Sequence, residues 1–104
     1  MNDRLLGMLG LAVRAGKVSF GVFMTEKALD EGRAKLVVAA EDIGISNRRR
    51  IENKCNEFSV KLMFYSDKAT LSRAAGKKDM PVLAVCDDGF AQAIVKKHND
   101  VHTH

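Results

Sequence analysis

The stretch KLVVAAED, Lys35 to Asp42, places five apolar residues in a row between a lysine and two acids. An apolar run of this length is typical of a strand buried on both faces, because a half-exposed strand would alternate apolar and polar residues. Strands of this kind belong to sheets that helices cover on both sides. The stretch therefore predicts an α/β protein with a largely parallel central sheet, and the acids Glu41 and Asp42 mark where the strand leaves the core.

Helical patterns precede this strand. Asp3 can cap a first helix over about residues 4–15, and Gly16 follows as its C-terminal stop. A second helix begins near Phe20 or Gly21 and ends at Gly32, with an apolar stripe at helical spacing. That stripe consists of Phe20, Phe23, Met24 and Ala28.

The same alternation continues after the strand. A third helix is expected with Ser46 as its cap, then a strand, a short fourth helix, a second strand and a last helix. Their markers are the stripe Ile51, Cys55 and Phe58; the strand Lys61 to Tyr65; a helix capped by Ser66 or Asp67 and ended by Gly76; the strand Val82 to Cys86; and a helix opened by Asp87 or Asp88. The order predicts a three-layer α/β/α sandwich.

Composition limits the class of protein. A chain of 104 residues fits one domain, here residues 1–104, and we expect the tail from about residue 97 to be frayed. Asp3 and Arg4 precede the N-terminal apolar stretch, which argues against a secretion signal and for a cytoplasmic protein that inserts in no membrane. Seventeen basic against thirteen acidic residues give a formal charge of +4, which favours anionic partners.

Catalytic and cofactor motifs are absent from the sequence. It has no phosphate-binding glycine loop, no nucleophile elbow and no zinc-protease motif, so we expect no enzyme and neither a cofactor nor a metal. All three histidines lie in the last seven residues, where only His98 and His102 suggest incidental metal binding. Cys55 and Cys86 are far apart and are expected as free thiols. A nucleotide-handling enzyme on such a sheet is therefore the weakest alternative.

Several segments together resemble a known family. They are GLAVRAGKV (Gly10 to Val18), then Gly21, Lys27, Ala28 and Gly32, then AKLVVAAED (Ala34 to Asp42), and later LSRAAGKK with the strand PVLAV. In this order, over about Leu5 to Ile94, they resemble the kink-turn RNA-binding ribosomal proteins related to archaeal L7Ae and eukaryotic L30e, especially short bacterial members. The resemblance implies an α/β/α sandwich with a mixed four-stranded sheet, including a short strand near Lys17 and Val18.

The resemblance also implies where RNA would bind. The family uses the start of its second helix, with a glycine matching Gly21 and a lysine matching Lys27, and a clamp loop matching Gly76 to Pro81. Within that loop Lys77 and Lys78 would meet phosphate, and Met80 with Pro81 would supply apolar surface. Lys17 and Arg14 are placed beside the helix start and are expected to reach phosphate as well. Solvent exposure or a helix-capping role is the alternative for each basic residue.

The chain departs from the family at Phe23 and Met24. Family members that read sheared G·A pairs carry Asn and Glu at these positions, so this chain cannot make the same base-edge hydrogen bonds. Either these side chains pack into the core, or one of them is exposed and offers a stacking surface to an unpaired base or a protein. The sequence leaves both alternatives open.

Three arginines, Arg48, Arg49 and Arg50, open the third helix. They fan across its surface, so a solvated face is one explanation and a second RNA patch is the other. The leading hypothesis is non-enzymatic binding of structured RNA, such as a kink-turn in rRNA, in ribosome function or assembly. The rival is a protein-interaction module for ribosomal or translation proteins, with Phe23 and Met24 as its apolar centre.

Overall fold

Helices and strands alternate along the part of the chain described by the computed structural model, residues 3–102, with side chains up to residue 99. The elements in chain order are α1 (Arg4–Arg14), β1 (Val18–Phe20), α2 (Gly21–Asp30), β2 (Leu36–Ala39), α3 (Ile45–Phe58), β3 (Leu62–Phe64), α4 (Lys68–Ala75), β4 (Val82–Val85) and α5 (Asp88–His102). The predicted order of elements is confirmed.

The four strands form one mixed sheet in the order β1-β4-β2-β3. β2 and β3 are parallel, whereas β4 runs antiparallel to both of its neighbours, β1 and β2. The mixed sheet implied by the family resemblance is confirmed. The largely parallel sheet expected from the apolar run alone is wrong, because burial on both faces fixes the covering helices and leaves strand direction open.

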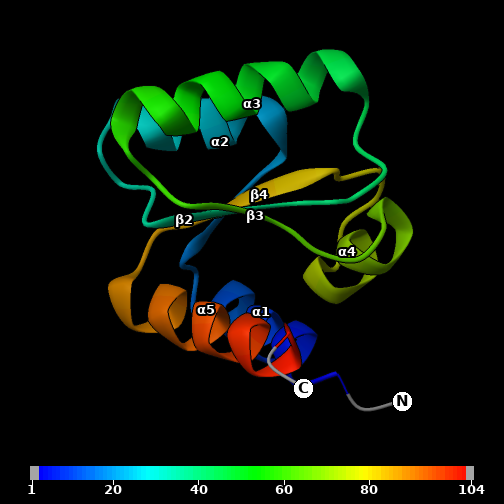
Figure 1. Cartoon of the computed structure of the whole chain (residues 1–104). Coiled ribbons are helices and arrows are strands. Elements are labelled where there is room, and N and C mark those ends of the chain that lie inside the picture. The colour runs from blue at the N-terminus through cyan, green and yellow to red at the C-terminus, as the bar shows by residue number, and fades with distance from the viewer. Residues whose placement is uncertain (1–2, 103–104) are drawn as a thin grey trace.

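Helices cover both faces of the sheet, which confirms the three-layer α/β/α sandwich (Figure 1). Along β2, Leu36 and Val38 pack in the cluster with α1, α4 and α5, while Val37 and Ala39 pack in the cluster with α2 and α3. All four residues are buried. This two-sided burial is the physical basis of the continuous apolar run in the sequence.

Acidic side chains cap several helices as predicted. Asp3 accepts a hydrogen bond from the Leu6 amide at 3.0 Å, and Asp67 accepts one from the Thr70 amide at 2.7 Å. The prediction for α3 is wrong, because that helix begins at Ile45 after Gly44, and no side chain caps it. Ser46 therefore lies inside the first turn of α3.

Two further expectations need correction. Phe58, expected in the α3 core stripe, is 38% exposed, and the Lys54 ammonium lies 5.7 Å from its ring centroid. α5 continues to His102, past the position where we expected a frayed tail to begin. The side chain of His102 and all of His104 lie outside the described residues, and His98 makes an edge-to-face contact with Tyr65.

Candidate nucleic-acid interface

The start of α2 is an open helix terminus. Gly21 has φ of +86°, in the left-handed region that favours glycine, and nothing lies within 4 Å of a Cβ placed there. The preceding residue, Phe20, makes no side-chain cap, so the first amides of α2 have no side-chain acceptor from it. Helix N-termini of this kind carry a partial positive charge and attract anions. The turn itself therefore requires Gly21, and the space beside it is free.

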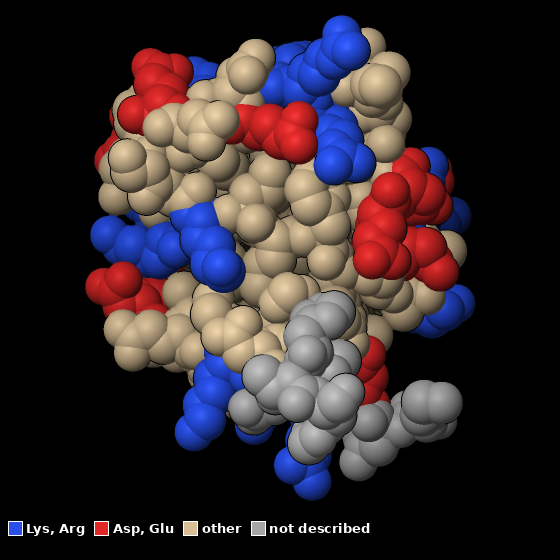
Figure 2. All heavy atoms as spheres, viewed as in Figure 1, with Lys and Arg blue, Asp and Glu red and all other residues tan. Residues whose placement is uncertain are grey.

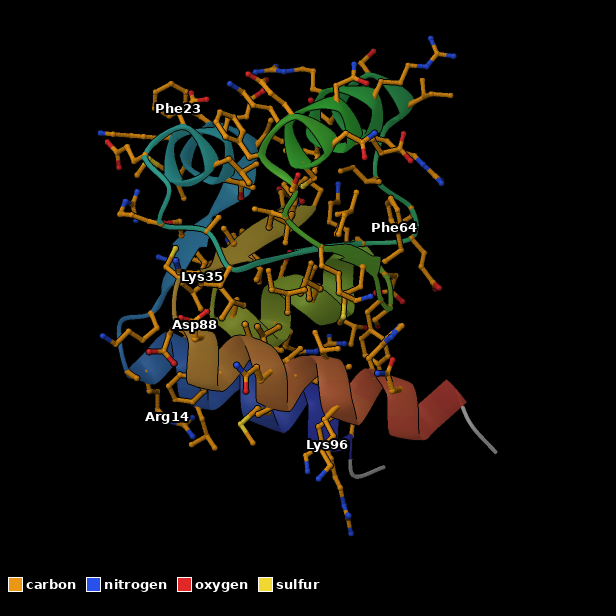
Figure 3. All side chains as sticks on the ribbon, turned by 60° about the vertical axis from the view of Figure 1, so that its left-hand side comes forward. Arg14, Phe23, Lys35, Phe64, Asp88 and Lys96 are labelled. Carbon is orange, nitrogen blue, oxygen red and sulfur yellow. The ribbon has the colours of Figure 1, made fainter. Side chains whose placement is uncertain are left out.

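Phe23 and Met24 lie on the surface of this first turn. Phe23 is 73% exposed and Met24 is 39% exposed, so the alternative that both pack into the core is wrong. The buried face of α2 consists of Thr25, Ala28 and Leu29, so Ala28 of the predicted stripe is buried as expected. Figure 3 shows the Phe23 ring on the outside of α2, where it is available to a partner.

The loop between α4 and β4 lies beside the start of α2. The Lys77 ammonium is 4.5 Å from the centroid of the Phe20 ring, the residue directly before α2. The Pro81 carbonyl accepts a hydrogen bond from the Ala40 amide at 2.7 Å, which fixes the end of the loop at the sheet. The structure thus brings the two segments implied by the resemblance together.

Met80 does not contribute apolar surface to this loop. It is 3% exposed, and its amide donates to the Ser72 hydroxyl at 2.8 Å while that hydroxyl donates to its carbonyl at 3.2 Å. The expectation for Met80 is therefore wrong. The two hydrogen bonds of the buried Ser72 hydroxyl hold the Met80 backbone against α4, and the Met80 side chain is buried. Lys77 and Lys78 remain exposed, and Pro81 is half-buried.

A basic hollow of about 350 Å³ lies on the α4 side of the loop. Its lining residues are Lys68, Ala69, Ser72, Arg73, Lys77, Lys78 and Asp79. Lys68 forms a long ion pair with Asp79, at 3.9 Å between nitrogen and oxygen. Lys68 and Arg73 were missed by the sequence analysis, although both basic residues lie on the short helix that leads into the predicted loop.

A second hollow, of about 320 Å³, lies between α2 and α3 beside Phe23. Its charged lining consists of Glu26, Lys27, Asp30 and Lys54. The Lys54 ammonium pairs with Asp30, whereas Lys27 forms no ion pair within the described residues. Lys27 lies one turn after Phe23 on the same face of the helix, so a ligand at Phe23 can reach its ammonium.

The three arginines of α3 do not form one patch. The Arg50 guanidinium pairs with Glu26 at 2.5 Å, and the Arg48 guanidinium pairs with Glu52 at 3.2 Å and lies 4.4 Å from the Phe64 ring centroid. Arg49 alone of the three has no ion pair with a described side chain. Two of the three predicted phosphate ligands are thus held by carboxylates of the protein itself.

Arg14 and Lys17 lie at the opposite end of β1 from the start of α2. The Lys17 carbonyl accepts a hydrogen bond from the Cys86 amide at 2.7 Å, next to the start of α5. Arg14 ends α1 on this side, and Figure 3 shows it below Asp88. Both were expected beside Gly21, but the strand that separates them from it carries them about 10 Å away.

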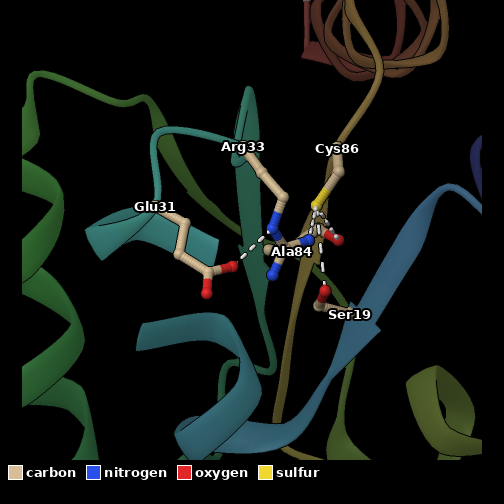
Figure 4. A network of polar contacts seen from close by, with 5 residues as sticks. All are labelled: Ser19, Glu31, Arg33, Ala84 and Cys86. Atoms are coloured by element: carbon tan, nitrogen blue, oxygen red, sulfur yellow. Dashed lines mark hydrogen bonds and ion pairs between the residues drawn. The ribbon is translucent and has the colours of Figure 1, made fainter. Parts of the chain in front are cut away.

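A polar network occupies the same end as Lys17 (Figure 4). The Arg33 Nε donates to Glu31 at 2.7 Å, and its Nη1 lies 3.8 Å from the Cys86 sulfur. That sulfur also contacts the Ser19 hydroxyl at 3.8 Å. Arg33 is therefore engaged within the fold, and both Cys55 and Cys86 are free thiols.

The open edge of the sheet at β3 shows little charge at its centre. Figure 2 views this face, where uncharged residues fill the middle and most Lys, Arg, Asp and Glu side chains lie around the margin. Among the described residues no helix is long and apolar enough to cross a membrane, and no group of three potential metal ligands occurs.

Comparisons with known proteins agree with this architecture. The RNA-binding protein YlxQ of Bacillus subtilis (strain 168) is 38% identical over 88 residues, covering 85% of this chain and 88% of that protein. The large ribosomal subunit protein eL8 of Cenarchaeum symbiosum (strain A) is 34% identical over 92 residues, covering 88% of this chain and 73% of that protein. These relatives are RNA-binding and ribosomal proteins by name, not enzymes, in line with the prediction from the sequence.

Solved structures share the fold. A protein of unknown function from Bacillus halodurans C superposes with a TM-score of 0.90 at 28% identity, covering 94% of this chain and 99% of that chain. The 15.5kD RNA binding protein of Giardia lamblia superposes with a TM-score of 0.79 at 20% identity, covering 98% of this chain and 91% of that chain, which shows a common fold. The family described as ribosomal protein L7Ae/L30e/S12e/Gadd45 matches residues 3–95, nearly the whole sequence. The chain therefore belongs to the ribosomal protein L7Ae/L30e/S12e/Gadd45 family.

Proposed function

We propose that this chain binds structured RNA, without catalysis, at the start of α2 and the adjoining α4–β4 loop. We call this region the α2–loop surface; it consists of Gly21, Phe23, Met24, Lys27, Lys68, Arg73, Lys77, Lys78 and Pro81. The observation that carries the proposal is the 73% exposure of the Phe23 ring beside Lys27, a lysine without an ion pair among the described residues. An exposed aromatic ring next to free cations suits a ligand with both flat bases and phosphates.

Phosphate contacts would supply most of the affinity. The open amides at Gly21 form an anion site at the helix terminus, and Lys27, Lys77 and Lys78 can neutralise phosphates around it. Each neutralised phosphate releases counterions, so the logarithm of the affinity should fall linearly with the logarithm of the salt concentration. The basic hollow at Lys68 and Arg73 would extend this contact to the phosphates of the RNA strand beyond the start of α2.

Phe23 and Met24 would determine how strongly the surface prefers particular bases in the RNA. Neither side chain can hydrogen-bond to a base edge, whereas a base stacked on an aromatic ring gains about 1 to 3 kcal/mol. Stacking accepts any base, so we expect tight binding with a loose sequence preference. The RNA we propose is a bent or bulged element of rRNA of the kink-turn class, recognised by shape and by an unpaired base.

The names of the relatives support a role for RNA binding at the ribosome. YlxQ is described as an RNA-binding protein and eL8 as a protein of the large ribosomal subunit. We therefore propose a cytoplasmic role in ribosome function or assembly. Ribosomal or translation proteins would be further partners, outside the surface that RNA covers.

A protein-interaction module is the second candidate. α2 and α3 run parallel with matching ion pairs, Glu26 with Arg50 and Asp30 with Lys54, so Gly21 of α2 is level with Ile45 of α3. Ile45 is 68% exposed, so the paired helix starts present two apolar side chains. A protein partner would bury both, whereas RNA binding requires the Phe23 ring and the lysines.

The two candidates differ in their response to salt and to conservative changes. Fluorescence anisotropy with a labelled kink-turn RNA at several salt concentrations would compare Lys27→Gln, Phe23→Ala and Phe23→Tyr with the unchanged chain. We expect Lys27→Gln to lower the salt slope by about one unit, and Phe23→Ala to weaken binding by about tenfold while Phe23→Tyr binds normally. If Lys27→Gln changes neither affinity nor slope, the α2–loop surface is not the RNA site. Binding of a protein that survives nuclease and high salt would favour the rival.

A further inference from the structure

Exposed cations fall into two groups. Those with carboxylate partners form the pairs Arg33–Glu31, Arg48–Glu52, Arg50–Glu26, Lys54–Asp30 and Lys68–Asp79. Most of the others gather in two places within the described part of the chain. One place is the α2–loop surface, and the second is the far end of the sheet, where β2 and β3 begin.

At this far end a hollow of about 310 Å³ opens between the sheet and α5. Its lining residues are Lys35, Lys61, Asp88, Ala91, Gln92, Val95 and Lys96. Lys35 directly precedes β2 and Lys61 directly precedes β3, which is the neighbouring parallel strand. Figure 3 shows Lys35 above Asp88 at the start of α5, with Lys96 further along that helix.

We propose that this hollow, the far-end hollow, is a second binding site for RNA phosphates. Its lysines are exposed, and none of Lys35, Lys61 and Lys96 forms an ion pair or hydrogen bond with a described side chain. Asp88 is the single carboxylate in the lining, so the hollow keeps an excess of two positive charges. Like charges held together repel, and a polyanion relieves that repulsion where a neutral ligand cannot.

The lining of the hollow suits RNA better than a single small anion. Ala91 and Val95 give it an apolar wall, against which a ribose or a base can lie, and the Gln92 amide can donate to an oxygen of the ligand. The lysines come from two strands and a helix, so they can contact successive phosphates rather than a single ion. Lys17, which the sequence analysis assigned to the α2 side, lies at this end and adds a further cation.

The site deepens the proposed function and rests on it. The far-end hollow and the α2–loop surface lie at opposite ends of β2, Leu36 to Ala39. The backbone of this strand spans about 10 to 13 Å. Because the two surfaces lie at opposite ends of the strands, one short duplex placed at the helix start cannot also fill the hollow. A longer RNA would contact both, and the protein would hold two RNA segments together.

Lysine acetylation footprinting tests this inference on the full chain. The protein is acetylated alone, with a minimal kink-turn RNA and with purified bacterial rRNA, and each lysine is quantified by mass spectrometry. We expect both RNAs to protect Lys27 and Lys77, and only rRNA to protect Lys35, Lys61 and Lys96, by about threefold or more. If rRNA protects the α2–loop lysines and leaves these three unchanged, the second site is wrong. If neither RNA protects any lysine, the proposed function itself fails.

A charge-matched pair of variants provides a second test. Lys61→Gln with Lys96→Gln removes two cations from the hollow, and Arg4→Gln with Arg49→Gln removes two exposed cations that line neither surface. On rRNA the first variant should lower the salt slope by about two units and weaken binding by about tenfold, while the control stays within about twofold. On the minimal kink-turn RNA both should bind like the unchanged chain. Equal effects of the two variants on rRNA would overturn the proposal.

Discussion

The ammonium group of Lys77 lies 4.5 Å from the centroid of the Phe20 ring. This contact joins the α4–β4 loop to the residue that immediately precedes α2. A cation held over an aromatic face is stabilised by about 0.5 to 1 kcal/mol at an exposed site. The two segments of the α2–loop surface are thus positioned relative to each other before any ligand binds.

Removal of the Phe20 ring should therefore lower the affinity for RNA while the chain remains folded. Phe20→Leu keeps an apolar side chain packed against the core and releases Lys77, so we expect RNA affinity to fall by about threefold to fivefold. Phe20→Tyr keeps the ring and should bind normally. Anisotropy titrations would measure both, with melting temperatures as the fold control, and equal affinities of the two variants would exclude a role for the contact.

Ser72 determines the course of the loop. Its buried hydroxyl bonds both the amide and the carbonyl of Met80, at 2.8 Å and 3.2 Å. Ser72→Ala leaves a buried backbone amide without a partner, so the free energy of unfolding should fall by about 1 to 3 kcal/mol. Urea denaturation would measure it, with Ser46→Ala at the exposed start of α3 as a control expected within about 0.5 kcal/mol. A loss of stability no larger than the control's would mean that the loop is held by other contacts.

Two glycines should respond oppositely to the same substitution. Gly21 has a positive φ of +86°, so Gly21→Ala strains the turn before α2 and should destabilise the chain by about 1 to 2 kcal/mol. Gly7 lies inside α1 with nothing within 4 Å of an added Cβ, so Gly7→Ala should stabilise by about 0.5 to 1 kcal/mol. Thermal unfolding of both variants measures the difference, and a stabilising Gly21→Ala would show that the turn adapts.

Alkaline pH should destabilise the fold through Cys55, which is buried, and Tyr65, which is partly buried. Burial raises the pKa of the Cys55 thiol from 9.0 to about 11, and burial together with a hydrogen bond to Asp3 raises the pKa of Tyr65 to about 12. The unfolded chain loses the Cys55 proton above about pH 9 and the Tyr65 proton above about pH 10, before the folded chain does. The free energy of unfolding therefore falls as pH rises, by at most about 1.4 kcal/mol per pH unit for each group. Urea denaturation from pH 8 to pH 10.5 would measure the slope. Cys55→Val should flatten it, and an unchanged slope would assign the effect to other groups.

The central strands were predictable because burial on both faces leaves a direct trace in sequence. Leu36 to Ala40 form a continuous apolar run, and each of them is buried. β1 has only the residues Val18 to Phe20, too few for a periodic signal, and only the family resemblance indicated it. Strand direction left no trace at all, because an antiparallel β4 buries the same residue types as a parallel one.

The arrangement of the candidate site was predictable in part. The resemblance implied that the start of α2 and the loop at Lys77 belong to one surface, and the structure places Lys77 beside Phe20, the residue before Gly21. Arg14 and Lys17 follow the same pattern in sequence, but an intervening strand carries them to the other end of the sheet. Proximity in sequence cannot show which end of a strand a side chain occupies.

Burial of individual side chains was the least predictable feature. Phe23 fitted the apolar stripe of α2, yet Ala28 is the one residue of that stripe that the helix buries, together with Thr25 and Leu29. Met80 looked like loop surface and is buried by its hydrogen bonds to Ser72. In both cases the outcome depends on a helix phase or a tertiary contact that a linear pattern does not contain.

Backbone amide shifts of the ¹⁵N-labelled chain, titrated with a kink-turn RNA and followed by NMR, test the proposed RNA site most directly. We expect the largest changes on Gly21, Phe23, Lys27 and Lys77, and we expect these changes to shrink as salt rises. Changes confined to α3 or to the β3 edge, or no change at RNA concentrations that saturate binding, would contradict the proposed site.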